Sequence, residues 1–474
     1  MSRRQQLFKM SRTCLAVLID LLLRLEAQVR ELRGQIKELK DRLALNSRNS
    51  SKPPSTDGLA KPAPKSLRQK TGRPRGGQPG HPGQTLQQIS QADHVVVHPL
   101  DRCTCGRCPR RSLRHEPVLR YEKRQIFELP HKPLEVTEHQ AEVKRCPVSG
   151  CLVSACFPEE INAPAQQGPR FKAQMIYFNQ QHFIPFQRLT QVCQDLYGQP
   201  LSEATIVAAN QRAYGNLAPF EQHLMVLLPQ APINHCDESG LRVAGQLHWL
   251  HVVSNAALTF YGVHPKRGTE AMNYLNILPR CKNWIIHDHF KAYFTDQDCL
   301  HALCNEHHLR ELKFLYEEHQ ELWAEELSGF LVDCNARRKV EGVLEEKEFK
   351  KVLAKYHAIL AKGRRRHPRL QGRGPHSKAA NLLRRLEDYD LCALAFLFDP
   401  VVPFTNNQGE RDIRMEKVRQ KISGCFRTLH GARVFARIRS YISTCRKQGR
   451  NILDSIENAI LGNPFIPSLP NRGP

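Results

Sequence analysis

Two aspartates follow apolar, strand-like segments and together could hold a metal ion. Asp237 follows Ile233-Asn234-His235-Cys236, and Asp288 follows Trp284-Ile285-Ile286-His287. Carboxylates at the C-terminal ends of neighbouring strands lie where the ligands of a sheet usually bind, and buried together they repel each other unless a cation lies between them. Oxygen ligands of this kind suit Mg²⁺ or Mn²⁺. Either aspartate alone would more often be a turn or helix-capping residue.

A third acid, Glu410, precedes a row of basic residues. Arg414, Lys417 and Lys421 lie four, seven and eleven residues after Glu410. On a helix this spacing places all four side chains on one face. A metal ligand beside cations that bind phosphate is what phosphoryl transfer requires. The same spacing is equally typical of a solvated helix laced with ion pairs.

A cluster of cysteines predicts a structural zinc site. Six of the 16 cysteines lie in one short segment, namely Cys103, Cys105, Cys108, Cys146, Cys151 and Cys156. Two separated pairs of thiols are the usual framework of a zinc ribbon. The favoured ligands are Cys105, Cys108, Cys146 and Cys151, although the second pair is spaced more widely than is common. Free buried cysteines are the alternative, and it is left open which of Cys103, Cys105 and Cys156 lie outside the site.

The composition indicates a large, basic, globular protein. The chain has 474 residues, of which 41% are hydrophobic and 24% charged. This length predicts roughly three domains. Lys and Arg number 70 against 46 Asp and Glu, a formal charge of +24. Such a charge attracts polyanions, of which nucleic acid is the commonest, although a basic protein of membrane surfaces would also fit.

The sequence contains no uninterrupted stretch of about 18 apolar residues, so we predict no transmembrane helix. The apolar segment from Cys14 to Leu23 is interrupted by Asp20, and no small-residue cleavage site follows it. We therefore expect no signal peptide and a cytoplasmic protein. In that compartment the cysteines would be reduced thiols or metal ligands.

The N-terminal residues 1–45 carry an apolar seam that predicts a coiled coil. The seam consists of Leu15, Leu18, Leu22, Leu25, Val29, Leu32, Ile36, Leu39 and Leu43. Alternating spacings of three and four are typical of a coiled coil, which would make the protein at least a homodimer. A helix packed on the protein's own core is the alternative. Gly34 weakens the helix interior.

Residues 46–84 have the composition of a basic, disordered linker. Arg73 and Arg75 lie in a Gly-Arg-Pro-Arg-Gly run, which could enter a DNA minor groove. The alternative is a solvated linker with diffuse affinity for phosphate.

Residues 85–160 are predicted to be short strands around the cysteines, because Val95 to Val97 and Arg124 to Leu129 have strand-like patterns. Residues 161–230 are predicted to be helical. Helices from Gln187 to Tyr197 and from Ser202 to Tyr214, separated by Gly198, would form a helix-turn-helix, although many such pairs do not touch DNA.

Residues 231–299 predict a mixed sheet of strands with one helix, from Thr269 to Leu278. Almost all of residues 300–363 are predicted to be helical, and this stretch is highly charged. Residues 431–474 form a basic helical segment, and the stretch from Arg427 to Arg450 is expected to contact phosphates.

The chain resembles the bacterial insertion-sequence transposases of the IS66 type, which belong to the DDE class. The resemblance runs from the coiled coil to about Pro464, which is most of the chain, and rests on several blocks that occur in order. The blocks are Asn46 to Pro54, Gly76 to His81, Asp237 to Val243, His287 to Tyr293, Cys304 to His307, Asn406 to Arg414 and Arg439 to Thr444. Together they are far more specific than any one motif.

The resemblance implies a multidomain α/β protein whose catalytic core, residues 231–299 and 401–430, is ribonuclease-H-like. It implies that residues 300–400 are a helical insertion. It further implies that Asp237, Asp288 and Glu410 hold two Mg²⁺ or Mn²⁺ ions for two-metal phosphoryl transfer. Water would cut the end of the element, and the freed 3′-hydroxyl would attack target DNA. Gly409, where we expect a better helix former, suggests that its helix starts late or bends.

The resemblance also implies the zinc-finger-like segment, binding to DNA at the element ends and at the target, possible companion proteins encoded by the element, and association with the bacterial nucleoid. It assigns Cys304 and His307, which alone supply too few ligands for a metal site, a structural role. Two other functions stay open. One is a DNA-binding regulator or inactive remnant, and the other is a nuclease that cuts without joining.

Overall fold

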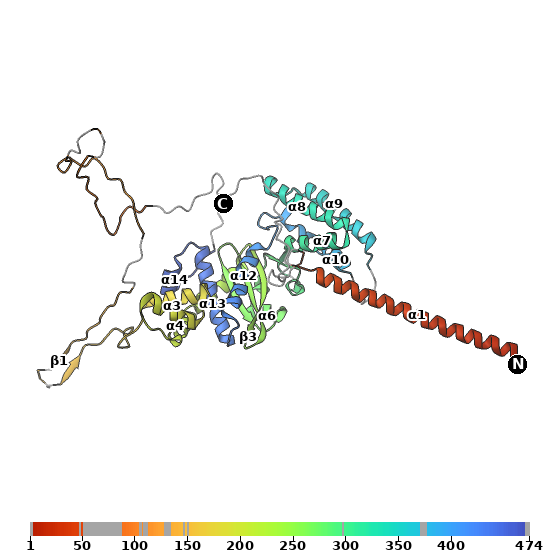
Figure 1. The fold of residues 1–474 in the computed structure, drawn as a ribbon, viewed down its shortest axis with the longest axis horizontal. Helices are drawn as coiled ribbons and strands as arrows, with labels where there is room; N and C mark the ends of the chain where they lie inside the picture. The colour runs from red at the N-terminus through yellow and green to blue at the C-terminus, as the bar shows by residue number, and fades with distance from the viewer. Residues whose placement is uncertain are drawn as a thin grey trace. The chain divides into compact units, whose positions relative to one another are not determined.

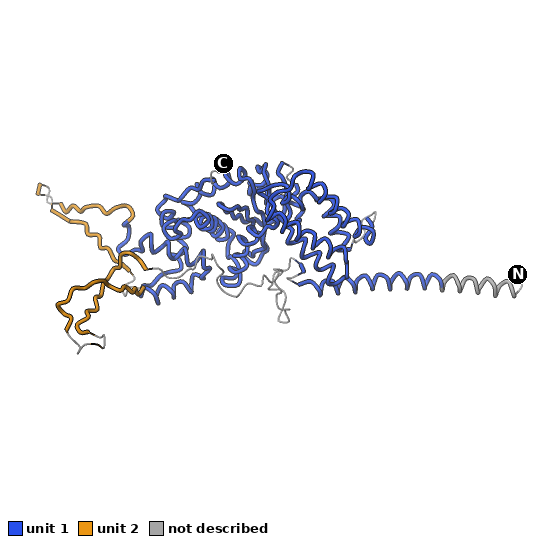
Figure 2. Tube along the Cα trace, turned by 90° about the horizontal axis from the view of Figure 1, so that it is seen from above, with its two compact units in different colours: residues 1–62, 161–474 blue, residues 63–160 orange. Residues whose placement is uncertain are grey.

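The computed structural model describes ten stretches of the chain, and it describes side chains from Ile19 onward. The stretches are residues 3–46, 49–50, 88–103, 107, 112–127, 134–145, 147–148, 151–295, 298–369 and 377–469. The chain forms two compact units, one made of Met1–Pro62 and Ile161–Pro474 and the other of Ala63–Glu160 (Figure 2). No described helix is long and apolar enough to cross a membrane.

The smaller unit contains less strand than its sequence suggests. In its described part, β1 (Val143–Arg145) pairs antiparallel with β2 (Leu152–Ser154), and every residue of both strands is exposed. Val95 to Val97 form no strand, and 80%, 76% and 56% of these side chains are exposed. The stretch from Arg124 to Phe127 forms none either. The expected strands are therefore wrong here, because a β-rich pattern forms a strand only where a partner strand covers it.

The N-terminal helix α1 (Arg3–Ala44) leaves its apolar seam uncovered over the part whose side chains are described, from Ile19 onward. The seam side chains from Leu22 to Leu39 are about half exposed. At the end of the helix, Ala44 and the following Leu45 lie against the core of the helices after the sheet. The helix ends on Asn49, which is 2% exposed and donates a hydrogen bond to the Ala44 carbonyl (3.1 Å). Asn46, Asn49 and Ser50 are therefore packed, unlike the linker expected there, and residues 51–84 of that expected linker lie outside the described residues.

A group of helices precedes the sheet. They are α2 (Pro169–Ile176), the π-turn η2 (Tyr177–Gln181), α3 (Phe186–Tyr197), α4 (Glu203–Asn216), α5 (Ala218–Leu227) and the 3₁₀ turn η3 (Leu228–Gln230). Gly198 ends α3 in the left-handed conformation (φ 65°), and Ser202 begins α4 by accepting a hydrogen bond from the Thr205 backbone N–H (3.1 Å). Whether α3 and α4 read DNA stays a prediction.

The strand β3 belongs to a sheet beside α12 and α6 (Figure 1), which has five strands in the order β5-β4-β3-β6-β7. The strands are β3 (Ile233–Val243), β4 (Gln246–Ser254), β5 (Thr259–His264), β6 (Trp284–His287) and β7 (Leu300–Leu303). Pairing is antiparallel between β3, β4 and β5, and parallel between β3, β6 and β7. Ala244 and Gly245, both with positive φ, make the two-residue turn from β3 to β4.

Two strand boundaries differ from the expectation. Asp237 does not follow β3 but lies within it, because the antiparallel ladder with β4 extends β3 to Val243. The first four residues of the expected helical insertion form β7 instead. A four-residue edge strand is too short to show a period of its own.

Helices complete the fold on both sides of these strands. They are α6 (Thr269–Leu275), η4 (Leu278–Arg280), η5 (Lys291–Thr295), α7 (Asn305–His319), α8 (Leu322–Glu341), α9 (Glu346–Arg366), α10 (Lys378–Asp388), α11 (Asp390–Leu394), η6 (Ala395–Leu397), α12 (Asn407–Ser423), α13 (Leu429–Lys447) and α14 (Ile452–Ile460). Helices α7 to α10 share one core with Ile286 and Ala302 of the sheet, so the insertion packs on the strands that precede it.

Helix α13 covers the edge strand β5. Ser440 Oγ accepts a hydrogen bond from the Tyr261 backbone N–H (2.8 Å), and Thr444 Oγ1 accepts one from the Thr259 backbone N–H (3.1 Å). Four residues along a helix rise about 6 Å, close to two residues along a strand. The two hydroxyls therefore match successive outward N–H groups of the edge strand.

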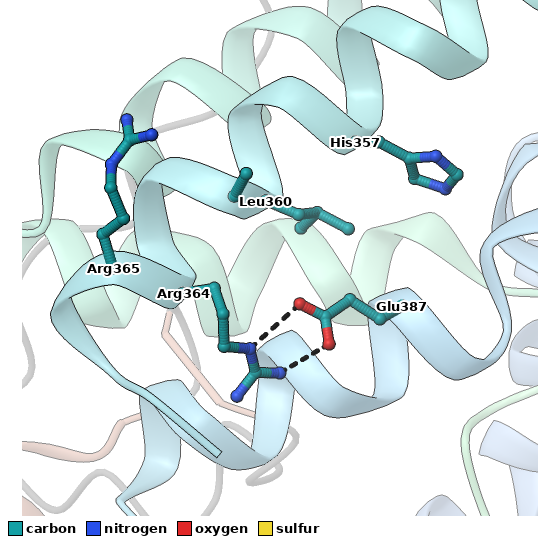
Figure 3. Close-up of a pocket in the computed structure, with 6 residues that line it drawn as sticks. His357, Leu360, Arg364, Arg365 and Glu387 are labelled. Atoms are coloured by element: carbon teal, nitrogen blue, oxygen red, sulfur yellow. Dashed lines mark hydrogen bonds and ion pairs between the residues drawn. The ribbon is translucent and has the colours of Figure 1, made fainter.

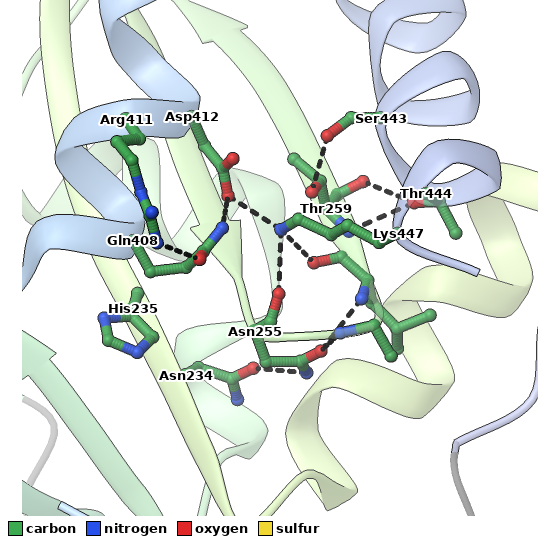
Figure 4. Close-up of polar contacts among 12 residues, drawn as sticks. Asn234, His235, Asn255, Thr259, Gln408, Arg411, Asp412, Ser443, Thr444 and Lys447 are labelled. Atoms are coloured by element: carbon green, nitrogen blue, oxygen red, sulfur yellow. Dashed lines mark hydrogen bonds and ion pairs between the residues drawn. The ribbon is translucent and has the colours of Figure 1, made fainter. Parts of the chain in front are cut away.

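The end of α13 is fastened by Lys447, whose ammonium group donates to the carbonyls of Asn255 (2.7 Å) and Leu258 (3.1 Å) and pairs with Asp412 of α12 (2.7 Å; Figure 4). Arg439 is 6% exposed and donates to Gln181. Much of α13 thus belongs to the core. Contact of the segment from Arg427 to Arg450 with phosphates stays a prediction, and Arg427, Arg433, Arg446 and Arg450 are exposed in it.

Candidate active site

The parallel pairing of β3 with β6 brings Asp237 and Asp288 level. The register runs from Ile233 opposite Trp284 to His235 opposite Ile286, and each aspartate lies two residues further on its chain. Because β6 ends at His287, β3 loses its parallel neighbour at this level. Asp237 therefore lies at the C-terminal edge of the parallel part of the sheet, although its own strand continues.

The Asp237 carboxylate lies in a strongly negative environment. Burial raises the pKa of Asp237, and the neighbouring carboxylates of Glu238, Asp288 and Glu410 raise it further. Hydrogen bonds orient both aspartates, since the Glu238 backbone N–H donates to Asp237 (2.8 Å) and the Phe290 backbone N–H donates to Asp288 (2.8 Å). Acids from β3, from the segment after β6 and from α12 thus act on one another, which is the arrangement that a cation would relieve.

Glu238 supports this strand from its other face. Successive side chains of a strand point to opposite faces, so Glu238 points away from Asp237. Its side chain is 1% exposed and pairs with Arg267 (2.6 Å), while the Tyr293 hydroxyl donates to it. The Arg267 guanidinium lies 4.1 Å from the centre of the Phe290 ring. Sequence reasoning missed this ion pair, because Arg267 lies 29 residues away from Glu238.

Glu410, in the first turn of α12, is approached by Cys304, which caps the start of α7, and by two side chains of α7 itself. Cys304 Sγ lies 4.0 Å and His307 Nδ1 lies 3.8 Å from Oε1 of Glu410, and Arg310 Nη2 lies 3.8 Å from its Oε2. Cys304, His307 and Arg310 recur at every third residue, so they share one face of the helix. The sequence singled out Cys304 and His307 but offered no third ligand beside them, and it did not single out Arg310.

Asn406 ties the start of α12 to the strand that carries Asp237. The Asn406 side chain is 2% exposed, donates to the Cys236 carbonyl (2.7 Å) and lies 2.8 Å from His235 Nδ1. Its backbone N–H donates to Cys304 Sγ (3.1 Å). One residue therefore links β3, α7 and α12 next to Glu410. Burial lowers the pKa of His235 to about 4, so this imidazole is neutral at neutral pH.

Gly409 permits this contact. A Cβ at position 409 would lie 3.0 Å from Asn406 Oδ1. The helix begins at Asn407, two residues before the glycine. The expectation that the helix starts late at Gly409 is therefore wrong, and the glycine is explained by the close approach of the Asn406 side chain.

The three acids offer oxygen ligands, as Mg²⁺ and Mn²⁺ require, and they are spread apart. Among the described residues, the one group of three Cys, His, Asp or Glu side chains whose ligand atoms all lie within 4.8 Å of one another is Cys304, His307 and Glu410. Asp237, Asp288 and Glu410 therefore do not converge on a single point.

The predicted basic row lies on the exposed side of α12. Arg414, Lys417 and Lys421 are exposed, while Ile413 and Glu416 face the core. The Lys417 ammonium donates to the Gly240 carbonyl (2.9 Å), and partial burial lowers the pKa of Lys417. Arg73 and Arg75 lie outside the described residues, as do Cys105, Cys108 and Cys146 of the predicted zinc site, whereas Cys151 is exposed.

A hollow of about 350 Å³ elsewhere in the insertion contains none of these acids (Figure 3). It is lined by residues of α9 and by Glu387 of α10. Its charged pair is satisfied, since Arg364 donates to both oxygens of Glu387 (3.0 and 2.6 Å). We assign it no part in the chemistry.

Two family models match the chain. The model described as the transposase IS66 family matches residues 165–434, which include Asp237, Asp288 and Glu410. A model described as a family of unknown function, DUF6444, matches residues 7–87. No curated protein matches the chain.

Proposed function

The chain belongs to the transposase IS66 family, and from this premise we propose that it is a DDE transposase that binds the ends of an insertion sequence and cuts and joins DNA. Asp237, Asp288 and Glu410 are the catalytic, metal-holding acids of this proposal. The observation that carries it is the mutual influence of these carboxylates, which come from three separate elements. The mixed sheet with a helical insertion before α12 supports a ribonuclease-H-like core.

The three acids would hold two Mg²⁺ or Mn²⁺ ions. When bound, such ions lower the barrier to phosphoryl transfer by activating the attacking oxygen and stabilising the leaving oxygen. The chain's own contribution is to hold the acids in place. The backbone N–H groups of Glu238 and Phe290 hold the carboxylates of Asp237 and Asp288 in position. The clamp made by Asn406 sets the distance from Glu410 to β3.

DNA is the proposed partner. The formal charge of +24 attracts its phosphates, and the exposed row of Arg414, Lys417 and Lys421 begins one helical turn after Glu410. DNA lying along α12 would thus bring a phosphate to the acids. Arg73, Arg75 and helices α3 and α4 are further proposed contacts, and Cys105, Cys108, Cys146 and Cys151 are proposed zinc ligands.

Pairing two element ends requires at least a dimer, which the exposed seam of α1 would form with a second copy. We place the protein in the bacterial cytoplasm, at the nucleoid, where its substrate lies. Companion proteins encoded by the element belong to the same proposal.

The test is cleavage and strand transfer on labelled element-end DNA with Mg²⁺ or Mn²⁺, comparing wild type with Asp288→Asn. We expect nicked and joined products that require the metal and disappear in the variant while DNA binding persists. Nicks without joined products would favour a nuclease. Binding without any product, even with companion proteins supplied, would favour a regulator or inactive remnant.

A further inference from the structure

Glu410 has a second set of possible metal partners besides the two aspartates. Cys304, His307 and Glu410 each offer one ligand atom, and these atoms all lie within 4.8 Å of one another. The thiol and the imidazole belong to the start of α7, and the carboxylate to the first turn of α12. Thiolate, imidazole and carboxylate are the side-chain ligands that zinc takes in proteins. Sequence alone offers two of these ligands, and the fold adds the third.

We propose that Cys304, His307 and Glu410 form a binding site for Zn²⁺ that is distinct from the two-ion site of the proposed reaction. The two sites share Glu410, so zinc bound here withdraws that carboxylate from the catalytic ions. The competition for Glu410 rests on the proposed function, whereas the zinc site itself does not.

Cys304 is held as the thiolate ligand of a metal usually is. Its side chain is 1% exposed, and its Sγ accepts a hydrogen bond from the Asn406 backbone N–H at 3.1 Å. Zinc binds cysteine as the thiolate, so coordination would release the thiol proton to solvent.

His307 presents an unused ring nitrogen to the same point. Its Nδ1 is buried, has no hydrogen-bond partner in the described part of the chain, and lies 3.8 Å from Glu410 Oε1. A buried polar atom without a partner costs about 1–3 kcal/mol. A metal ion between the imidazole and the carboxylate would satisfy it.

The two oxygens of Glu410 have different neighbours. Oε1 faces Cys304 and His307, whereas Oε2 faces Arg310 (3.8 Å). Arg310 can therefore hold the carboxylate in place while Oε1 binds metal, as outer partners of ligating carboxylates do. A thiolate selects zinc, whereas Mg²⁺ prefers oxygen ligands. The two sites thus prefer different ions and compete for one carboxylate.

Zinc content tests the site without any DNA. Full-length protein is stripped of metal, refilled with Zn²⁺ and dialysed, and the zinc per chain is measured. We expect Cys304→Ser and His307→Gln each to hold about one ion fewer than wild type. The comparison is a difference, because the cysteines from Cys103 to Cys156 are also predicted to bind zinc. Cys334→Ser, which alters another buried cysteine of the insertion, should keep the wild-type content.

His307→Gln decides the matter if Cys304→Ser does not fold, since the His307 side chain is 20% exposed and tolerates change better. Equal zinc content in wild type and His307→Gln would overturn the site.

The competition for Glu410 is tested by titrating Zn²⁺ into a cleavage reaction at fixed Mg²⁺. Wild type and Cys334→Ser should be inhibited alike, and His307→Gln should need at least about tenfold more zinc. Equal sensitivity of His307→Gln would refute the sharing of Glu410. If wild type does not cleave at all, the proposed function fails, while the zinc content still decides the site.

Discussion

At the scale of the residue, the acids of the candidate site lower the stability of the fold. Asp237 is buried among carboxylates that raise its pKa. A folded pKa above the unfolded value means that the ionised group costs stability, and that the cost grows as the pH rises from the unfolded to the folded pKa. The cost is present at neutral pH unless a cation binds.

Asp237→Asn should therefore stabilise the metal-free protein, by on the order of 1 kcal/mol at pH 7, and abolish cleavage. Mg²⁺ should raise the melting temperature of wild type and not that of the variant. Asp412→Asn is the matched control with the opposite sign, because Asp412 pairs with Lys447 and loses a favourable partner. Thermal melts with and without Mg²⁺ measure both. A destabilised metal-free Asp237→Asn would contradict the account.

Gly409→Ala should displace the Asn406 side chain and lower the rate of cleavage more than it lowers DNA affinity. The added Cβ lies 3.0 Å from Asn406 Oδ1, so the link between β3 and α12 must shift and Glu410 with it. Gly329→Ala in α8 is the control, since its Cβ meets nothing within 4 Å and should stabilise the helix by about 1 kcal/mol. Single-turnover rates and DNA binding separate the two effects. A variant that cleaves at the wild-type rate would exclude the clamp.

Residue types and spacing identified Asp237, Asp288 and Glu410 as candidates, because carboxylates after apolar runs are visible in one chain. They could not identify Asn406 or Arg310. These residues act through contacts with positions about 100 or more residues away, as between Asn406 and Cys236 or between Arg310 and Glu410. Such contacts are decided by tertiary packing and leave no local pattern.

At the scale of the element, α13 shows how a helix can close a sheet. Ser440 and Thr444 accept the outward backbone N–H groups of Tyr261 and Thr259, so the edge strand β5 offers neither group to another chain. Lys447, at the end of α13, pairs with Asp412 of α12, so α13 also joins the sheet to α12.

Thr444→Val should cost about 1–3 kcal/mol of unfolding free energy, because valine has the same shape and leaves the buried Thr259 N–H without an acceptor. Ser443→Ala is the control. Its hydroxyl bonds to the side chain of Thr259 (2.9 Å) and not to the strand backbone, so it should cost less. Urea unfolding measures both values. Equal costs would mean that α13 does not protect the strand through these hydroxyls.

The long, periodic elements were predictable from sequence, and the short ones were not. The α1 seam, the pair α3 and α4, and the strands around the acids follow from periodicity and capping. The four residues of β7 and the extension of β3 past Asp237 depend on partner strands. The missing strands near Val95 show the converse, since a strand-forming composition without a covering partner stayed extended coil.

At the scale of the whole molecule, the apolar seam of α1 is exposed and lacks a packing partner among the described residues of the chain. Its apolar side chains from Leu22 to Leu39 are about half exposed, whereas helices of the same chain pack on the sheet. We expect a second copy of the chain to cover the seam.

Leu32→Glu should convert the dimer to monomer, because it places a negative charge in the seam of each chain and the two charges repel each other. Ala27→Glu adds the same charge on the opposite side of α1 and should leave the dimer intact. Sedimentation over a range of concentrations distinguishes these outcomes. A wild type that stays monomeric, or equal effects of both changes, would contradict a coiled coil.

The central claim is that Asp237, Asp288 and Glu410 hold the ions that cut DNA, and a change of metal preference at Asp288 tests it most directly. A thiolate binds Mn²⁺ better than Mg²⁺, because it is a softer ligand than a carboxylate. Asp288→Cys should therefore fail to cleave element-end DNA with Mg²⁺ and regain activity with Mn²⁺, while Asp288→Ala stays inactive with either ion. Cleavage by Asp288→Ala at the wild-type rate, or equal activity of Asp288→Cys in both metals, would contradict the account.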